Sequence, residues 1–465
     1  MTEPESRAPE TGRRSAVRRR VSPTALLAVL LPLLTVGALA LVSPQQAVTP
    51  SRDPEQVSPS RVDLVCPSGP AGSAVGLTAS GGADGDVSSF SPGDIDPSRV
   101  SVVADSVEIL ARPEAIFVRG DGGIAAELIG ARSSERELAT TECVLPQPEY
   151  WLTGLGAGAE HATSLELSNP DEGPAVADVT VWGRTGEINV PSLRGVTVPG
   201  GDSTVLDLAE ELPRRSELAI HVVVSRGRMT ATALDEIPAL GSRSTAAAWL
   251  PPVTEPATEQ LLLGLAGGEG SDTLVLANPG EDEARVELRV VTADASFVPE
   301  GQDEIRVSPG SVETVTLTET LRAQVREGAL GLQIISTAPV TAALRSVLDD
   351  DLVHTPSVTG TASAVTGLVP AGAAELVLAR AGGAGVAVVA AYGGGELISE
   401  ERVELTDGSG GRVELPDKTD LVRVTPRRTD VSASVVVTSG RGSTVVPLRE
   451  LVRVALIPNV RPGLP

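Results

Sequence analysis

The sequence is poor in aromatic side chains, with three tryptophans, two tyrosines and three phenylalanines among 465 residues. Hydrophobic cores must therefore be filled by Val, Leu, Ile and Ala, and the branched side chain of Val suits a pleated sheet. The shortage predicts strands, and it weighs against a sugar site lined by rings. The rings that could form such a platform are Tyr150, Trp151, Trp182, Trp249 and Phe297, and we expect core packing for most of them.

Lysine is almost absent, since Lys418 is the only one, and the use of arginine instead is typical of GC-rich coding. The formal net charge is −24. The first 20 residues carry a net +3, which leaves −27 on the rest of the chain. A surface this acidic repels phosphate backbones, so a nucleic-acid partner is excluded. We expect the excess carboxylates to keep the protein soluble.

Histidines are also few, and His161, His221 and His354 have no metal-ligand spacing to one another or to a cysteine. We expect ordinary structural or surface histidines. No GxSxG elbow, HExxH helix or P-loop occurs, so the sequence predicts no catalytic residue, no cofactor and no metal ligand. Glycoside hydrolysis by a pair of carboxylates is the one enzymatic alternative left open.

Only two cysteines are present, Cys66 and Cys143, and both lie in the part of the chain predicted to be exported. An oxidising compartment favours pairing them, so we predict a disulfide. The alternative, a reactive or metal-binding thiol pair, lacks any CxxC or CxxH spacing.

One long uncharged run begins at Val21, and 22 helical residues from there would span about 33 Å, enough for a bilayer core of about 30 Å. We predict a transmembrane signal-anchor over 21–42, with a basic cytoplasmic tail over 1–20, because Arg18, Arg19 and Arg20 precede the run. The bulk of the chain then lies outside the cytoplasm. A signal peptide cleaved after Ala40 is the alternative, and in that case the protein is secreted.

A Pro- and Ser-rich linker is predicted over 43–61, followed by a β domain over 62–148 that the cysteines bracket. The domain has a Gly-, Ser- and Asp-rich loop over 79–97. Its strand candidates are Val100–Val103, Val107–Leu110, Ala115–Val118 and Ile124–Ile129.

An internal repeat with a period near 109 residues follows. Leu165-Glu-Leu-Ser-Asn169-Pro170 recurs as Leu274-Val-Leu-Ala-Asn278-Pro279, and alternating apolar positions follow both copies. Proline ends a strand ladder and asparagine can close a turn with its own side chain, so this is a repeat turn motif. We predict an all-β fold of tandem antiparallel immunoglobulin-like β-sandwich repeats behind one N-terminal transmembrane helix. The repeats span 149–252, 253–362 and, in degenerate form, 363–465.

Two weaker motifs are interpreted as structural. Gly154-x-Gly156-x-x-Ala159 resembles a dinucleotide fingerprint, but a strand follows where that motif needs a helix, so we expect loop glycines, as at 264–268 and 382–385. The pairs Asp84/Asp86 and Asp94/Asp96 could offer oxygen ligands to Ca²⁺. They lack the EF-hand order, so we expect a solvated acidic loop. The run 349–351 is expected to be a charged turn between repeats.

The chain resembles an actinobacterial family of membrane-anchored secreted proteins built on a domain of unknown function. The matching motifs run from Cys143 to the start of the second repeat. They are Cys143, Tyr150-Trp151, Gly154, the Asn169-Pro170 turn, Val198-Pro199-Gly200 and Trp249-Leu250-Pro251. The resemblance implies no activity.

We therefore expect a non-catalytic cell-envelope scaffold or protein-interaction module, held at the membrane by its single helix. Two alternatives stay open, a binding module for cell-wall glycan and an accessory subunit of a membrane-bound envelope enzyme. An exposed aromatic groove would favour glycan, whereas an exposed apolar patch or an unpaired strand edge would favour a protein partner.

Overall fold

The computed structural model describes residues 23–41, 55–94, 96–238, 245–253, 255–349, 351–380, 383–406, 410–451 and 455–457. Residues 56–455 form one compact unit, and the two ends of the chain form another. In the second unit, helix α1 (Pro23–Leu41) occupies most of the predicted anchor segment. Within the described residues, no helix meets the length and apolarity needed to cross a bilayer. The anchor stays a prediction, and the tail over 1–20 lies outside the described residues.

Four hydrophobic cores organise the unit 56–455, and each is built from one consecutive stretch of the chain. Apolar and polar side chains alternate along the strands, and the apolar ones form the cores. Val179 and Val181 are buried, for example, whereas Asp178 beside them is exposed. Each core falls within one of the segments predicted from the sequence. We call the stretches lobe 1 (residues 61–148), lobe 2 (149–253), lobe 3 (255–358) and lobe 4 (361–450).

Lobe 1 consists of two four-stranded antiparallel sheets, ordered β2-β7-β4-β5 and β6-β3-β8-β9. A disulfide joins Cys66, at the end of β2, to Cys143, just after β9, as predicted. The bond therefore links the two sheets. The elements are β2 (Arg61–Cys66), β3 (Ala74–Ala79), β4 (Gly85–Phe90), β5 (Ser98–Val102), β6 (Glu108–Leu110), β7 (Ile116–Asp121), η1 (Gly122–Ala126), β8 (Leu128–Ser134) and β9 (Ala139–Glu142).

Two of the strand and loop predictions for lobe 1 are wrong. The run Ile124–Ile129 was expected to be one strand, but it begins in the 3-10 helix η1. Gly122 has a φ of 72°, which turns the chain so that Ile124 enters the core before β8 starts. The expected loop over 79–97 contains β4, because Val87 is buried in the core despite its polar neighbours.

Lobe 2 has nine strands in the order β13-β12-β16-β10-β11-β17-β18, with β14 on β12 and β15 on β11. The contact between β10 and β11 is a single pair, so the strands divide there into two layers around one core. The elements are β10 (Glu149–Ala157), β11 (Ala162–Asn169), β12 (Ala175–Gly183), β13 (Gly186–Ile188), η2 (Pro191–Leu193), β14 (Val196–Val198), β15 (Asp202–Asp207), α2 (Leu208–Glu211), β16 (Arg215–Arg226), β17 (Thr230–Ile237) and β18 (Ala246–Leu250).

Lobe 3 is organised by one 18-residue strand, β25, which pairs with β19 and β21 along its first half and with β20 and β26 along its second. The strand thereby belongs to both layers. The elements are β19 (Ala257–Leu263), β20 (Gly270–Asn278), β21 (Ala284–Val291), β22 (Ser296–Phe297), β23 (Ile305–Val307), β24 (Ser311–Thr316), α3 (Glu319–Arg326), β25 (Gly331–Leu348) and β26 (Asp351–Val358).

Lobe 4 has a five-stranded sheet, β30-β29-β32-β27-β35, and a four-stranded sheet, β31-β28-β33-β34. The elements are β27 (Val365–Leu368), β28 (Ala373–Arg380), β29 (Gly385–Gly393), β30 (Glu396–Leu405), β31 (Gly410–Glu414), β32 (Leu421–Arg427), β33 (Val431–Ser439), β34 (Gly442–Pro447) and β35 (Arg449–Glu450). The short strands β1 (Glu55–Val57) and β36 (Ala455–Ile457) lie where the two units divide.

The repeat is visible in the strand pairing. Strand β11 of lobe 2 lies between β15 and β17, β20 of lobe 3 between β24 and β25, and β28 of lobe 4 between β31 and β33. In each lobe the strand that carries the repeated Leu-x-Leu pattern has the same two kinds of neighbour. The immunoglobulin-like identification of these layers stays a prediction.

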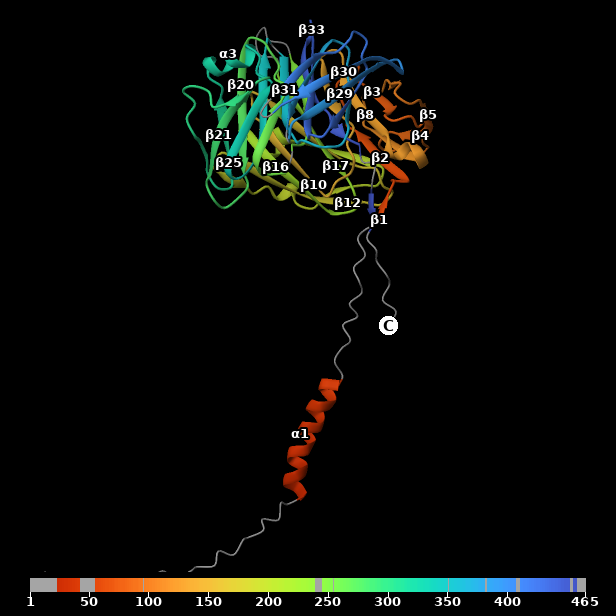
Figure 1. Cartoon of the computed structure of the whole chain (residues 1–465), viewed down its shortest axis with the longest axis vertical. Coiled ribbons are helices and arrows are strands. Elements are labelled where there is room, and N and C mark those ends of the chain that lie inside the picture. Colours follow the sequence, from red (N-terminus) through yellow and green to blue (C-terminus); the bar gives the residue numbers. More distant parts are fainter. Residues whose placement is uncertain are drawn as a thin grey trace, which may run out of the picture. The chain divides into compact units, whose positions relative to one another are not determined.

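The lobes do not form a linear array, because the final long strand of each lobe packs against those of two others. Strand β9 contacts β18 and β34, and β26 contacts the same two strands. Lobe 4 therefore meets lobe 1, and the four lobes close into a ring. Strand β8 of lobe 1 also contacts β27 of lobe 4. Figure 1 shows β3 and β8 of lobe 1 in orange and β29 and β30 of lobe 4 in blue.

Candidate functional site

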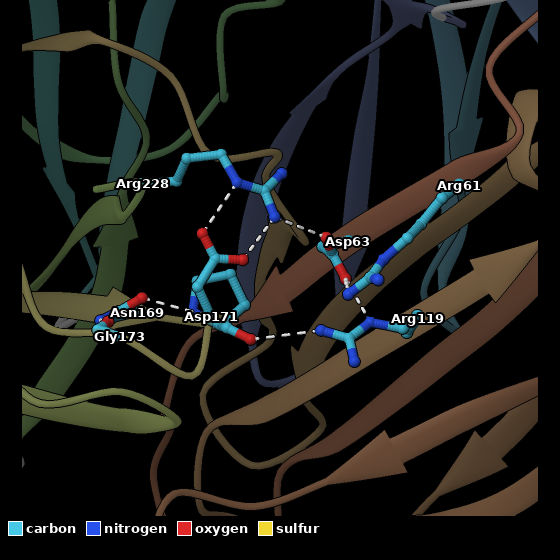
Figure 2. A network of polar contacts seen from close by, with 8 residues as sticks. Arg61, Asp63, Arg119, Asn169, Asp171, Gly173 and Arg228 are labelled. Carbon is cyan, nitrogen blue, oxygen red and sulfur yellow. Dashed lines mark hydrogen bonds and ion pairs between the residues drawn. The ribbon is translucent and has the colours of Figure 1, made fainter.

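The junction between lobes 1 and 2 centres on a buried carboxylate, Asp63 of β2 (Figure 2). Its oxygens accept hydrogen bonds from Arg119 Nε at 2.7 Å and from Arg228 Nη2 at 2.8 Å. The register of β2 and β7 places Arg119 opposite Asp63, whereas Arg228 belongs to lobe 2. Burial favours the neutral acid, but these hydrogen bonds outweigh it and lower the pKa of Asp63. Arg61, also of lobe 1, lies 3.6 Å from the same carboxylate. Asp63 therefore stays ionised and binds cations from both lobes.

Arg228 also binds a second carboxylate, Asp171, whose Oδ2 accepts from Arg228 Nε at 2.9 Å. The bonds to Asp171 raise the pKa of Arg228. Asp171 directly follows Pro170, so the repeat turn of lobe 2 lies at this junction. Half of the Arg228 side chain, 50%, is exposed. The junction is thus a row of alternating charges that is partly open to solvent.

Both asparagines of the repeat turn motif close the turn with their own side chains. In Asn169 and in Asn278, Nδ2 donates to the carbonyl four residues later, at 2.8 and 2.7 Å. In both, Oδ1 accepts from the N–H two residues later, at 3.0 Å. The copies differ in that next-but-one residue, which is Asp171 in lobe 2 and Gly280 in lobe 3. At this one position the turn of lobe 2 therefore has a carboxylate, which binds Arg228, and the turn of lobe 3 has none.

A second buried carboxylate, Asp235 of β17, lies where lobe 2 meets lobe 3. His161 Nδ1 lies 3.0 Å from each of its oxygens, and His354 Nε2 of lobe 3 lies 3.0 Å from Oδ2. Thr163 Oγ1 donates to Oδ1 at 2.7 Å. All four side chains are buried. Two of the three histidines of the chain thus meet on one carboxylate, which their sequence spacing did not indicate.

This cluster includes a further ion pair, between Arg345 Nη2 and Glu217 Oε1 at 2.6 Å. Burial favours neutral His161, but hydrogen bonds with Asp235 and Glu217 outweigh it and raise the pKa of His161 to about 9. Burial likewise opposes ionisation of Asp235, yet its bonds from both histidines hold its pKa well below the usual range. Two carboxylates are then balanced by Arg345 and protonated His161, and a buried charge cluster is tolerated when it is paired in this way.

The apolar part of this junction contains two of the three tryptophans. The Trp151 ring stacks on Trp182 at 5.6 Å and on His221 at 3.9 Å between centroids. These rings pack against lobe 3 residues Val275, Ala277 and Val312. All eight aromatic residues lie in the described part of the chain, and of these Phe297 alone is exposed. The rings considered as a sugar platform are therefore used mainly for packing.

Gly154 and Gly264 were expected in loops, but Gly154 lies inside β10, at a bulge. Both have positive φ, 95° and 85°, and both lie where another lobe comes close. A Cβ on Gly154 would meet Val275 of lobe 3 at 3.7 Å, and one on Gly264 would meet Val436 of lobe 4 at 3.1 Å. The positive φ therefore favours glycine at both positions, and at Gly264 the close approach of lobe 4 favours it as well.

Lobes 3 and 4 meet at Asp351, which was expected in a charged turn but belongs to β26. Its Oδ2 accepts from the N–H of Ser443 at 2.7 Å, and burial raises the pKa of Asp351 to about 6. Arg412 Nη2 donates to the carbonyl of Ala329 at 2.6 Å. An apolar cluster lies at the same junction and has members from both lobes, which include Leu263, Leu330, Val377 and Val436.

Lobes 4 and 1 close the ring through Arg423 of β32. Its Nη2 donates to Ser80 Oγ at 2.8 Å and to Asp105 Oδ1 at 2.6 Å, both in lobe 1. Its Nη1 donates to the Tyr392 hydroxyl at 2.9 Å, so the guanidinium is fixed from its own lobe as well. These partners are 318 and 343 residues from Arg423 in sequence, and no local pattern predicts them.

The four final strands enclose a cavity of about 20 Å³ at the centre of the ring. Each lobe contributes to its lining, with residues such as Thr140, Trp249, His354 and Val445. The volume is that of about one water molecule, so the centre is no substrate pocket. Glu142 at its rim pairs with Arg449 at 2.6 Å, and burial raises the pKa of Glu142 to about 7.

The acidic residues considered for Ca²⁺ are bonded within lobe 1. Asp84 Oδ1 accepts from the Ala104 N–H at 2.8 Å, and Asp86 Oδ1 accepts from Ser101 Oγ at 2.9 Å. Across the described residues, no group of three or more His, Cys, Asp or Glu side chains is arranged to hold a metal ion. Several buried or paired charged side chains, among them Asp63, Asp235 and Arg423, lie instead at junctions between lobes.

Comparisons with known proteins identify a family but no activity. The profile of a family of unknown function, DUF5719, matches residues 111–416. No curated protein matches the chain. A solved structure titled as a tetra-tandem repeat in the extending region of a large adhesion protein is 10% identical, with a TM-score of 0.10. The alignment spans 82% of this chain and 93% of the adhesion chain, and the low TM-score means that the two folds are not shown to be alike. Actinobacterial origin and membrane anchoring stay predictions.

Proposed function

The chain belongs to DUF5719, a family of unknown function, and we propose that it is a non-catalytic interaction scaffold that works outside the cytoplasm. The closed ring of four lobes is the observation that carries this proposal. Each lobe is held by two neighbours through ion pairs and apolar contacts, so surfaces on different lobes keep fixed distances. Fixed distances between surfaces are what a scaffold needs in order to hold partners in one geometry.

The use of the reactive side chains supports a role without catalysis. His161 and His354 are buried on Asp235, and His221 Nε2 lies 2.7 Å from a Glu149 oxygen while its ring stacks on Trp151. Histidines are the usual acid–base groups near neutral pH, and here all three take part in hydrogen bonds or ring stacking at or near the junction between lobes 2 and 3.

The disulfide between Cys66 and Cys143 supports the proposed location, because such bonds persist in oxidising compartments. We propose that segment 21–42 holds the protein at the membrane with its N-terminus in the cytoplasm, or is removed after Ala40 to release it. The glycan alternative loses support because Trp182, Trp249 and Tyr150 are buried. A protein partner is the proposal that fits the remaining surface.

Cross-linking of the full chain in its native cells, followed by mass spectrometry, tests this proposal. We expect partner proteins to be cross-linked from at least two lobes at once. The variant Arg423→Ala, which removes the bonds from this arginine to Ser80 and Asp105 and so weakens the junction between lobes 4 and 1, should reduce such paired cross-links. The matched control Arg427→Ala, at an exposed position of the same strand, should keep them. Absence of any protein partner, or hydrolysis of cell-wall material by the purified chain, would overturn the proposal.

A further inference from the structure

The longest strand at the end of a sheet is β30, with 10 residues, among the strands that the structure describes. It pairs with β29 along one side, and in the described part of the chain no strand pairs with its other side. Edge strands in soluble proteins are usually short, because the free N–H and C=O groups attract further strands. The length of this open edge therefore needs a reason.

The first part of β30 extends beyond the lobe 4 core. Leu405 is buried and Val403 packs against the core, so this alternate set faces inward. Glu401 continues the same set, yet it is exposed, and Leu397 is 53% exposed. Ile398, at a bulge in the pairing with β29, is 41% exposed. The open backbone edge of β30 is therefore flanked by exposed side chains, some apolar and some charged.

The charge along this edge is almost entirely of one sign. Glu396, Glu400, Glu401 and Glu404 are exposed, and Arg402 is the one basic residue of the strand. None of these four carboxylates forms an ion pair with another residue that the structure describes. A second copy of β30 would place carboxylates against carboxylates, which is unfavourable across a strand pair. A strand rich in lysine or arginine would meet the opposite charge.

We propose that β30 is the docking edge for an extended basic segment of a partner protein, which adds to the lobe 4 sheet as a further strand. This inference rests on the proposed scaffold function and names the surface and the chemistry of the partner. Main-chain hydrogen bonds to β30 supply affinity, and pairing of the partner cations with Glu400, Glu401 and Glu404 supplies specificity. The uninterrupted register with β29 places the docking stretch at residues 399–405.

Hydrogen exchange of the full chain, with a synthetic peptide of about nine residues as probe, tests the docking edge. The probe alternates lysine with threonine or valine, and a matched peptide has glutamate in place of each lysine. Because an added strand protects the amides that face it, we expect the lysine peptide to slow exchange within 399–405. We expect the glutamate peptide to leave this exchange unchanged. A lysine peptide N-methylated at alternate amides keeps its charge but cannot complete the ladder, so it should not protect β30.

Two variants of equal charge change separate docking from general attraction to an acidic surface. Glu400→Lys/Glu401→Lys/Glu404→Lys should weaken binding of the lysine peptide at least about tenfold. The control Glu281→Lys/Glu300→Lys/Asp303→Lys, at exposed positions of lobe 3, should bind within about twofold of the unmodified chain. Equal binding by both variants, binding without protection of β30, no binding, or self-association through β30 each overturns the inference. A cellular partner cross-linked elsewhere would leave the scaffold proposal standing while this one fails.

Discussion

Two junctions of the ring use buried carboxylates in opposite ways. Between lobes 1 and 2, Asp63 is bound by arginines, and half of Arg228 is open to water. Between lobes 2 and 3, Asp235 is bound by two histidines, and all of these side chains are sealed from solvent. In both arrangements one carboxylate binds side chains of two different lobes.

The difference lies in which condition can weaken each junction. Arginine does not titrate in the accessible pH range, but an exposed ion pair is screened by salt. Histidine does titrate, whereas a buried pair is hardly screened. The first junction should therefore respond to ionic strength and the second to pH. Trp249 donates to the Ser68 carbonyl of lobe 1, and Trp151 packs on lobe 3, so tryptophan fluorescence can follow both.

Removal of Asp235 should have the largest effect. The variant Asp235→Ala leaves a protonated histidine and a second histidine buried without their anion, so we expect the free energy of unfolding to fall by about 3–5 kcal/mol. The control Glu236→Ala, the next and exposed residue of β17, should change it by less than about 0.5 kcal/mol. Denaturant unfolding measures both. If both variants lowered the free energy of unfolding equally, the buried cluster around Asp235 would not be a source of stability.

Raising the pH from about 7 to 9.5 should weaken the junction between lobes 2 and 3 more than the other junctions. The pKa of His161 is about 9 in the folded protein and about 6.5 when unfolded, so its stabilisation is complete below pH 6.5 and is lost as the pH rises through 9. The full loss is roughly 3 kcal/mol. The raised pKa values of Asp351 and Glu142 act in the same direction, but only up to about pH 7. Thermal unfolding between pH 7 and 9.5 should therefore lose its pH dependence in His161→Gln.

The two asparagine turns offer a matched pair. Asn169→Ala and Asn278→Ala each remove the same side-chain bonds to the backbone, so each should cost about 1–2 kcal/mol. Asn169→Ala should cost more, because its turn also positions Asp171 beside Arg228. Limited proteolysis can show where the extra cost falls. Faster release of lobe 1 in Asn169→Ala but not in Asn278→Ala is expected, and equal release would contradict a role of this turn in docking.

Loss of the exposed arginine should have the smallest effect. Arg228→Ala should lower the free energy of unfolding by about 1 kcal/mol at low salt, because half of the side chain is solvated. In 1 M NaCl, where the screening length is about 3 Å, we expect the cost to fall by about half. The cost of Asp235→Ala should change little in the same titration. A salt effect of equal size on both variants would remove the distinction between the junctions.

Much of each lobe could be predicted from the sequence because the rules are local. The alternation of apolar residues that predicted the strands also explains why Leu167, Val179 and Val181 are buried in the lobe 2 core. The Asn-Pro repeat predicted a turn closed by an asparagine side chain. The presence of two cysteines in a chain that is itself predicted to be exported led to the prediction of the disulfide. The wrong prediction of a strand over Ile124–Ile129 also has a local cause. Gly122 has a positive φ, and a 3-10 helix forms where a strand was expected.

The candidate site could not be predicted, because it consists of contacts between lobes. His161 and Asp235 are 74 residues apart in sequence, and Asp235 and His354 are 119 apart. Neither pair has a spacing that any metal or catalytic motif uses. The one signal available beforehand was the recurrence of glycines at equivalent repeat positions, and it was interpreted as loop flexibility. The positive φ of Gly154 and Gly264, together with the close approach of lobe 4 to Gly264, is the actual reason.

The sequence by itself determined that the chain is built of strands, that a turn motif and its flanking strands recur, and that Cys66 pairs with Cys143. These follow from side-chain alternation, backbone preferences of proline and asparagine, and the redox chemistry of thiols. Only the tertiary structure decided that the lobes close into a ring, because contact between lobe 4 and lobe 1 depends on the summed orientations of every lobe between them. It also decided which charges are buried, and so which junction responds to pH and which to salt.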